Sequence, residues 1–236
     1  MAVIPARLAS TRLPRKMLRE VAGIPLIGYV YGAVRSCPLL EDVIVATDSD
    51  EILQVCQKNG WNARMTSPTH RSGTERVHEI SDSLHADVYV NVQGDEPMAR
   101  AEHICALLKL MENPDVQVGT LATPASDADV VNVRVNKVVV DKLGRALYFS
   151  HATIPFDRDG GRPRYLKHLG FYGYRKSALD QFVALPESSL ERIERLEQLR
   201  FLENGIPIHV AETPYNIIGV DTEEDLQQFE ENLRAQ

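Results

Sequence analysis

Short β-branched apolar runs alternate with amphipathic helical patterns in the first half of this chain. Val43–Thr47 and Asp87–Val92 have the length and composition of buried strands. Between them, Ser72–Leu84 predicts a helix, because Ser72 and Glu75 form a capping-box pattern and the apolar side chains fall on one face. Such an alternation favours an α/β fold with a mainly parallel sheet and helices on both of its faces.

The same patterns predict elements further along the chain. We expect further helices at Pro25–Arg35, Glu102–Met111, Ser188–Glu203 and Glu223–Leu233, and a further strand at Ile206–Ala211. In the helix that Ser188 begins, Ser188 and Glu191 form a second capping-box pattern, and an apolar row contains Leu190, Ile193, Leu196, Leu199 and Leu202. Lys137–Val140 and Ala146–Phe149 flank Asp141-Lys142-Leu143-Gly144 and predict a β-hairpin. We interpret residues 1–236 as one domain, with an insertion near residues 130–175 that forms a subdomain or an oligomer contact.

Composition narrows the classes of function. The chain has 33 acidic and 26 basic residues in 236, a net charge of −7, which disfavours a dedicated nucleic-acid binder. Its longest uncharged stretch, Val21–Val34, is too short to span a bilayer. The first residues carry no secretory pattern, and the three cysteines form no CxxC pair. We therefore expect a cytoplasmic protein with no membrane partner and no structural zinc.

The segment after the first predicted strand is strongly basic. Ile4–Lys16 reads IPARLASTRLPRK and carries four cations, Arg7, Arg12, Arg15 and Lys16. Open α/β sheets bind ligands in loops at the carboxyl ends of their strands. Arginine and lysine there suit phosphate oxygens. Neither a Walker loop nor a dinucleotide fingerprint is present, so we expect cationic side chains to take part in phosphate binding.

Two acidic segments are candidates for a metal site. Asp95 follows a predicted strand in Gln93-Gly94-Asp95, where Gly94 would permit a close approach of the backbone. Asp221 precedes the cap of the last predicted helix. Carboxylates beside substrate phosphates are ligands that hard divalent cations prefer. Each segment alone is also compatible with an ordinary acidic turn or with an acid at a helix N-terminus.

Other segments carry weaker signals. Ser72–Arg76 opens a helix whose free N–H groups suit an anion or a base edge, although a plain capping box explains part of it. Lys167–Arg175 contains His168, which would ordinarily be a core histidine. Leu196–Arg200 contains Glu197 and Gln198, which would ordinarily lie on the solvated face of a helix. Neither Cys37 nor His151 has a visible activating neighbour, which disfavours covalent catalysis.

Read together and in order, these segments resemble the 3-deoxy-manno-octulosonate cytidylyltransferases, also called CMP-Kdo synthetases. The matching segments are IPAR..STRLP.K, VATD, SGTER, NVQGDEP, KVVVD..G.ALYFS, HLGFYGYR, LEQLR and GVDTEEDL, from Ile4 to Leu226. The resemblance implies a three-layer, Rossmann-like nucleotidyltransferase fold that usually dimerises. It also implies the Mg²⁺-dependent reaction of CTP with the sugar acid Kdo to give CMP-Kdo and pyrophosphate, for lipopolysaccharide biosynthesis.

The resemblance also implies roles for individual residues. Arg7, Lys16, Asp95 and Asp221 would be catalytic, with Asp95 and Asp221 as the ligands of Mg²⁺. The nucleotide would be bound by Pro5, Ala6, Arg7, Ser10, Lys16, Ser72, Gly73, Arg76 and Gln93. The sugar acid would be surrounded by Gln93, His168, Tyr172, Glu197 and Gln198. The chain departs from the family where Arg15 replaces a glycine. If the N–H of that glycine approaches phosphate in the family, Arg15 must adopt another conformation.

Several alternatives stay open at this stage. The acceptor could be an 8-amino analogue of Kdo or a sialate-type acid, because discrimination by a single group depends on the geometry of the pocket. The chain could instead be a nucleotide-binding homologue without catalysis, or a simple phosphate-binding module. The presence of both Asp95 and Asp221 disfavours these last two readings.

Overall fold

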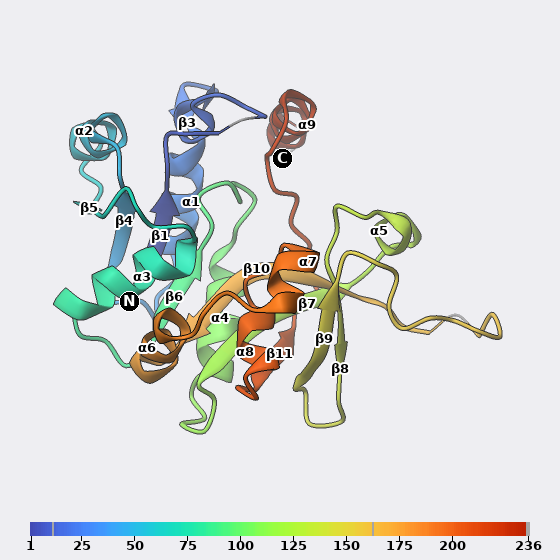
Figure 1. Ribbon diagram of the computed structural model, residues 1–236. Helices are drawn as coiled ribbons and strands as arrows, with labels where there is room; N and C mark the ends of the chain where they lie inside the picture. The colour runs from blue at the N-terminus through green and yellow to red at the C-terminus, as the bar shows by residue number, and fades with distance from the viewer. Residues whose placement is uncertain (11, 162, 235–236) are drawn as a thin grey trace. The chain divides into compact units, whose positions relative to one another are not determined.

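The computed structural model describes residues 1–10, 12–161 and 163–234, so Thr11 of the basic loop lies outside the described residues. The chain divides into two compact units (Figure 1). The first comprises Met1–Cys105 and Ile217–Gln236, and the second comprises Ala106–Asn216. The predicted insertion near residues 130–175 belongs to the second unit, and its role within a single domain stays a prediction.

The first unit contains a four-stranded parallel sheet. Its strands are β1 (Ala2–Ala6), β4 (Val43–Thr47), β5 (Ala63–Met65) and β6 (Tyr89–Val92), in the order β6-β1-β4-β5. All residues of β1, β4 and β6 are buried, as apolar runs without polar alternation predict. The predicted strand Val43–Thr47 is confirmed at both ends, and Asp87–Val92 is confirmed except for its first two residues.

Helices connect these strands. They are α1 (Leu26–Arg35), α2 (Asp50–Lys58) and α3 (Gly73–Ser83). Crossover connections between parallel strands are right-handed. The connections from β1 to β4 and from β4 to β5 move in one direction across the sheet, whereas the connection from β5 to β6 moves in the opposite direction. α1 and α2 therefore cover one face and α3 the other. The direction reverses between β1 and β6, which is where open sheets bind ligands.

Smaller elements complete the first unit. The loop after β1 leads through the 3-10 helix η1 (Lys16–Leu18) into a hairpin of β2 (Glu20–Val21) and β3 (Ile24–Pro25). The last helix, α9 (Glu223–Arg234), packs its apolar side chains onto a core made of Leu13, Val21, Leu26, Val220, Leu226 and Phe229. This packing holds the segment that carries Asp221 against the basic loop. The boundary between the two units falls within α4 (Ala101–Leu110).

The second unit contains a mixed sheet. β7 (Val118–Pro124) pairs in parallel with β11 (Ile208–Glu212) and antiparallel with β10 (Leu166–Tyr174). The predicted hairpin is confirmed as β8 (Lys137–Val140) and β9 (Ala146–Ser150), and β8 pairs antiparallel with β10. The α/β class with a mostly parallel sheet and a small antiparallel part is thus confirmed.

Four short helices belong to the second unit: α5 (Asp127–Val131), α6 (Lys176–Ala184), α7 (Ser189–Glu194) and α8 (Leu199–Glu203). The prediction of one helix over Ser188–Glu203 is wrong in its middle. Ser188 forms the expected capping box with Glu191, but Arg195 adopts a left-handed conformation with φ 58° and ends α7. Ile193, assigned to an apolar row, is 76% exposed.

Lys137 is a buried cation at the start of the hairpin. Its side chain has no exposed surface, and Nζ donates to the carbonyl oxygens of Asn132, Val135 and His151 over 3.0, 2.7 and 2.6 Å. Three carbonyl acceptors satisfy all three ammonium protons. The ammonium therefore ties the residues before β8 to the residue that follows β9.

Among the described residues, no helix is long and apolar enough to cross a membrane.

Candidate active site

The loops after β1 and β6 approach each other closely at the point where the strand direction reverses. A Cβ atom at Gly94 would lie 3.0 Å from the carbonyl oxygen of Pro5 and 2.9 Å from Sδ of Met17. A backbone oxygen cannot move aside as a flexible side chain does, so this contact requires glycine. The expectation that Gly94 permits a close approach is confirmed. It brings Asp95 toward the basic loop.

Three charged side chains meet at this point. Nζ of Lys16 donates to Oδ2 of Asp95 over 2.6 Å and to Oδ1 of Asp221 over 2.7 Å. Lys16 is 8% exposed, whereas the carboxylates are 30% and 44% exposed. Nη2 of Arg12, an exposed side chain, donates to the other oxygen of Asp221 over 2.8 Å. The predicted metal ligands and the predicted phosphate-binding lysine thus form one cluster.

The pKa shifts in this cluster keep its members charged. Burial lowers the pKa of Lys16, but the charges and hydrogen bonds of Asp95 and Asp221 outweigh it and hold the pKa above its ordinary value. Burial raises the pKa of Asp221, but Lys16 and Arg12 outweigh it and hold that pKa below its ordinary value. Both shifts have the same cause, the pairing of opposite charges. At neutral pH the cluster contains an ammonium and ionised carboxylate.

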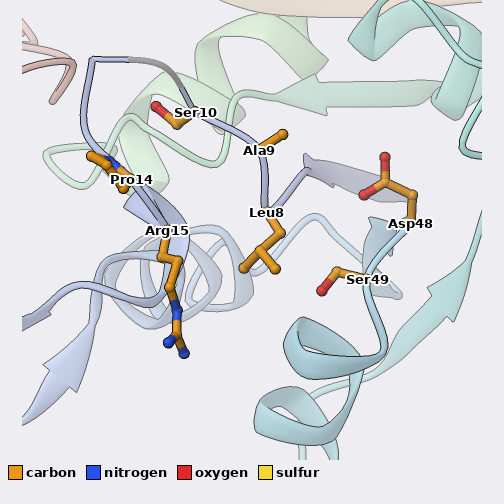
Figure 2. A pocket seen from close by; sticks show the side chains of 7 residues that line it. All are labelled: Leu8, Ala9, Ser10, Pro14, Arg15, Asp48 and Ser49. Atoms are coloured by element: carbon orange, nitrogen blue, oxygen red, sulfur yellow. The ribbon is translucent and has the colours of Figure 1, made fainter.

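The rest of the basic loop borders a pocket of about 560 Å³. Ser10, one of the predicted nucleotide-binding residues, lines it together with Leu8, Ala9, Pro14, Arg15, Asp48 and Ser49 (Figure 2). Arg7 is exposed, and no described side chain pairs with it. Pro5 and Ala6, the last two residues of β1, are buried and lead directly into this loop.

Arg15 has the backbone conformation that favours glycine. Its φ of 55° and ψ of 33° lie in the left-handed region, which glycine adopts most readily. Its side chain points out and pairs with Glu51, and both are largely exposed. Such a pair contributes only about 0–1 kcal/mol. Arg15 thus holds a left-handed backbone conformation at some cost in strain.

The start of α3 lies beside β1 and the residue that follows β6. A Cβ atom at Gly73 would lie 3.3 Å from Nε2 of Gln93 and 3.3 Å from Cγ of Pro5. The hydroxyl of Ser72 accepts a hydrogen bond from the N–H of Glu75 over 3.3 Å and so caps the helix itself. Three predicted nucleotide-binding residues, Ser72, Gly73 and Gln93, are therefore neighbours.

Arg76 has a different position from the one its predicted role suggests. It is 4% exposed, and its guanidinium pairs with Asp48 and donates to Oγ1 of Thr66 and the carbonyl of Ser67 over 2.7 and 3.1 Å. It therefore joins the end of β4 to the loop after β5. Sequence reasoning missed Asp48 as a site residue, although it directly follows β4. Any role of Arg76 toward a nucleotide stays a prediction.

The predicted sugar-binding residues of the second unit also gather. His168 and Tyr172 both lie on β10, with ring centroids 5.4 Å apart, and the charge of Glu197 contributes to raising the pKa of Tyr172, after burial. Glu197 and Gln198 occupy the turn between α7 and α8, not the middle of a helix as predicted. Gln198 is 4% exposed.

Proton accounting fixes the tautomer of His168. The hydroxyl of Thr120 donates its single proton to the carbonyl of Phe171 over 2.7 Å. Nε2 of His168 lies 3.0 Å from that same hydroxyl oxygen, so Nε2 carries the imidazole proton and donates. Nδ1 is then an acceptor. Burial lowers the pKa of His168 to about 3, so the ring is neutral at pH 7.

This pKa predicts a contribution to acid sensitivity. An unfolded histidine, with a pKa of 6.5, binds a proton below that pH, while folded His168 stays neutral down to about pH 3. Its contribution to stability is thus complete above pH 6.5 and is lost as the pH falls. Between about pH 7.5 and pH 5, wild type should lose ~2 kcal/mol more unfolding free energy than His168→Gln. Urea unfolding at each pH measures this, and parallel curves for the two proteins would contradict it.

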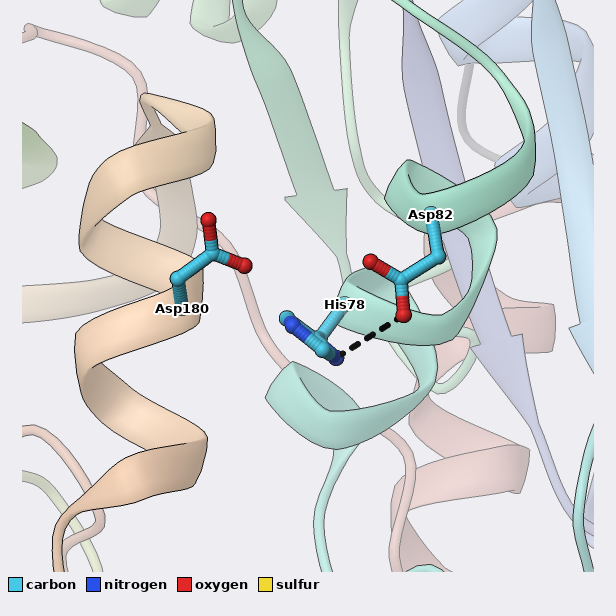
Figure 3. Close-up of side chains that lie close together, drawn as sticks. All are labelled: His78, Asp82 and Asp180. Atoms are coloured by element: carbon cyan, nitrogen blue, oxygen red, sulfur yellow. Dashed lines mark ion pairs between the residues drawn. The ribbon is translucent and has the colours of Figure 1, made fainter.

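The structure also shows a histidine–aspartate pair that sequence reasoning did not single out. Nδ1 of His78 lies 3.6 Å from Oδ2 of Asp82, one turn later on α3 (Figure 3). Pairs at this spacing stabilise helices by about 0.2–0.5 kcal/mol when both groups are charged. Asp180, drawn in the same figure, belongs to α6 and pairs there with Lys176. We assign His78 and Asp82 to the support of α3.

Comparisons with known proteins find relatives that cover nearly the whole chain. A family model described as cytidylyltransferase matches residues 1–211. A 3-deoxy-manno-octulosonate cytidylyltransferase of Koribacter versatilis is 64% identical over 99% of this chain and 90% of its own length. The one from Acidobacterium capsulatum is 54% identical, covering 99% and 96%. A solved structure of CMP:2-keto-3-deoxy-manno-octonic acid synthetase complexed with CTP has a TM-score of 0.95 at 40% identity, covering 99% of this chain and 98% of that one.

Proposed function

This chain belongs to the cytidylyltransferase family and transfers CMP from CTP to 3-deoxy-manno-octulosonate (Kdo), and we propose that the cluster of Lys16, Asp95 and Asp221 is where this chemistry is carried out. The observation that carries the proposal is the convergence of one buried ammonium and two carboxylates at the reversal point of the sheet. Measuring pyrophosphate release with CTP and each of Kdo, its 8-amino analogue and a sialate tests the activity and the acceptor.

The reaction sets the demands on the site. The anomeric hydroxyl of Kdo gives up its proton to solvent, and its oxygen forms a bond to the α-phosphorus of CTP. The bond from that phosphorus to the bridging oxygen breaks, and pyrophosphate leaves with its electron pair. The substrates bring many negative charges together. Catalysis therefore consists mainly of neutralising charge and aligning the attacking and leaving oxygens. We find no need for a protein nucleophile in this scheme.

A divalent metal fits the carboxylate pair. Cytidylyltransferases of this kind generally depend on a divalent metal, and we propose Mg²⁺ with Asp95 and Asp221 as its ligands. Their oxygens Oδ2 and Oδ1 already converge on one cation, the ammonium of Lys16. Carboxylate oxygens are the donors that Mg²⁺ prefers. When bound, the metal supplies positive charge that offsets the phosphate oxygens and lowers the cost of bringing the substrates together.

The residues of the first unit bind and align the nucleotide in this proposal. Arg7 and Lys16 offset the charge of the departing pyrophosphate, and the hydroxyl of Ser10 donates to a phosphate oxygen. Ser72, Gly73 and Gln93 seat the cytidine, which agrees with their mutual proximity. Arg76 acts through Asp48 and Thr66, since its guanidinium is engaged with these groups. It is a positioning residue.

The residues of the second unit orient the sugar acid. Neutral His168 presents Nδ1 as an acceptor for a sugar hydroxyl, because its Nε2 proton is donated to Thr120. Tyr172, Glu197 and Gln198 supply further polar groups for a polyhydroxylated ring. Burial and the charges of Tyr174 and Glu197 hold the pKa of Tyr172 well above its ordinary value, so its hydroxyl keeps its proton.

The loop cations should differ in importance. Arg7→Ala should lower kcat/KM by about 10- to 100-fold, because a charge-assisted contact contributes roughly 1.5–3 kcal/mol. Arg15→Gly should change kcat/KM less than about 3-fold and leave stability within ~1 kcal/mol, since glycine relieves the left-handed strain and loses only an exposed ion pair. Steady-state kinetics and urea unfolding measure both. Equal losses at Arg7 and Arg15 would mean that the loop acts as a diffuse positive patch.

We further propose that the enzyme forms a homodimer and provides CMP-Kdo for lipopolysaccharide biosynthesis in the cytoplasm. The second unit carries large apolar side chains that are more than half exposed: Val131, Val133, Leu143, Leu147, Phe156 and Ile193. Such side chains are commonly covered by a partner. Light scattering after gel filtration measures the mass, and Phe156→Asp with Leu147→Asp should shift it toward the monomer.

A further inference from the structure

Lys16 is held at the position between the two proposed metal ligands. Its Nζ lies 2.6 Å from one oxygen of Asp95 and 2.7 Å from one oxygen of Asp221. The side chain leaves the first residue of η1, which Arg15 introduces in a left-handed conformation, and it is 8% exposed. The lysine is thus buried and directed at the carboxylates by the backbone. It is not a flexible surface side chain that has met an acid by chance.

We propose that Lys16 is a resident counter-ion that holds the metal site ready in the free enzyme, and that Mg²⁺ binds by displacing its ammonium from Asp95 and Asp221. This inference rests on the proposed function, because it takes these carboxylates to be the metal ligands. It adds that one position serves two cations in turn.

Simultaneous occupation is disfavoured by distance and charge. Mg²⁺ binds carboxylate oxygens at about 2.0–2.1 Å. An ion that uses the same oxygens as Nζ would lie beside the ammonium, and like charges at such separation in a partly buried site repel strongly. The second oxygen of Asp221 already accepts from Arg12. The ammonium must therefore leave before both carboxylates can hold the metal.

The arrangement explains how two carboxylates can stay together without a metal. Side by side and partly buried, Asp95 and Asp221 would repel each other and move apart if no cation lay between them. The ammonium neutralises this repulsion and keeps the ligands converged. A displaced lysine needs a new anion, and its flexible four-carbon stem allows it to reach one. Phosphate oxygens of CTP are that anion in the proposed reaction, so nucleotide should favour the exchange.

The test compares Mg²⁺ binding to the full chain without nucleotide. The readouts are calorimetric titration with MgCl₂ and the rise of the melting temperature, Tm, in MgCl₂ relative to EDTA. Lys16→Met removes the charge and keeps an apolar stem, while Lys16→Gln also keeps a hydrogen-bond donor. Both should bind Mg²⁺ at least ~10-fold tighter than wild type, since a competing ion pair has been removed. Arg12→Met is the matched control, because it removes the exposed partner of Asp221, and it should change Mg²⁺ affinity less than ~3-fold.

Both kinds of failure can be told apart. If the lysine variants are destabilised in EDTA, Mg²⁺ should restore their Tm, and a shift no larger than that of wild type would overturn the proposal. Unchanged or weaker Mg²⁺ binding in both variants would also overturn it, while leaving the carboxylate site standing. Lys16→Gln combined with Asp221→Asn should lose the tight binding. If this double variant kept it, the metal would lie elsewhere and the proposed function of the carboxylate pair would fail as well.

Discussion

Asp95→Asn and Asp221→Asn should each lower kcat by about 100-fold or more while the protein stays folded, because an amide is a much poorer ligand for a hard cation than a carboxylate. The loss should be partly relieved at high Mg²⁺ concentration if the remaining carboxylate still binds. Pyrophosphate release at limiting and at saturating Mg²⁺ measures the effect, and circular dichroism checks the fold.

A matched control separates the metal site from general loss of acidic charge. Asp50 is exposed in the first turn of α2, in the same unit, and among the described residues it forms no ion pair with Lys16 or another cation of the basic loop. Asp50→Asn should keep turnover within about 2-fold and cost a few tenths of a kcal/mol at the helix N-terminus. Near-normal turnover of both site variants at limiting Mg²⁺ would show that the two carboxylates do not hold the metal.

His168→Ala and Gln198→Ala should raise the KM for Kdo about 10-fold or more and leave the KM for CTP within ~2-fold, since each would remove a polar contact that only the sugar acid makes. Both side chains are buried, so both variants should also melt at lower temperature. The ratio of the two KM values, measured on the same preparations, is therefore the informative quantity. The Tm alone does not separate a binding residue from a core residue.

Two other residues of the second unit serve as controls for these variants. His209, a half-buried histidine of β11, and Gln181, an exposed glutamine of α6, have no predicted contact with the sugar. Alanine at either position should leave both KM values within about 2-fold. A drop in Tm for His168→Ala and Gln198→Ala without a selective rise in the KM for Kdo would mean that these side chains only fill the core.

Local patterns predicted the elements whose stability is local. Both ends of Val43–Thr47 are predicted correctly, because every residue of this β-branched run is buried in the sheet. The capping box of Ser188 with Glu191, set by neighbours three residues apart, is confirmed. Ser72 caps α3 with its hydroxyl, but the carboxylate of Glu75 accepts from the N–H of Arg71, so the reciprocal half of the predicted box is not formed. By contrast, β10 was not predicted as a strand, since its glycines interrupt the pattern. A Cβ atom at Gly173 would lie 2.8 Å from Cγ of Met111, a packing reason that the sequence does not display.

The break at Arg195 shows why the long helix could not be excluded from sequence. Arg200 forms a buried pair with Glu191 at 2.6 Å, and its guanidinium lies 4.0 Å from the ring centre of Phe182. In a continuous helix, residues nine apart point in opposite directions and lie about 13–14 Å apart along the axis. The pair and the stacking therefore require the chain to turn back. These contacts depend on α6, which precedes the helix and had not been predicted.

Part of the candidate site could be predicted from the sequence. The cations of the first loop and the carboxylates after β6 could be placed at one edge of a parallel sheet by topology alone. Asp221 lies 126 positions after Asp95 by their residue numbers, and only the family resemblance linked them before the structure showed both on Lys16. The ion pair of Arg76 with Asp48 could not be predicted, because a buried arginine needs acceptors nearby and the sequence does not show which distant residues supply them.

Because the ammonium of Lys137 is fully enclosed, chemical modification of this lysine measures how often the hairpin opens. An amine-reactive reagent such as acetic anhydride modifies lysines it can touch, and Lys137 has no exposed surface in the folded chain. Burial lowers its pKa only while the hairpin is closed, so an uncovered Lys137 should react at the rate of an ordinary exposed lysine. Mass spectrometry of the peptide that carries Lys137 would then give the rate at which the ammonium separates from its three carbonyl acceptors. The measurement uses the intact enzyme and needs no substitution.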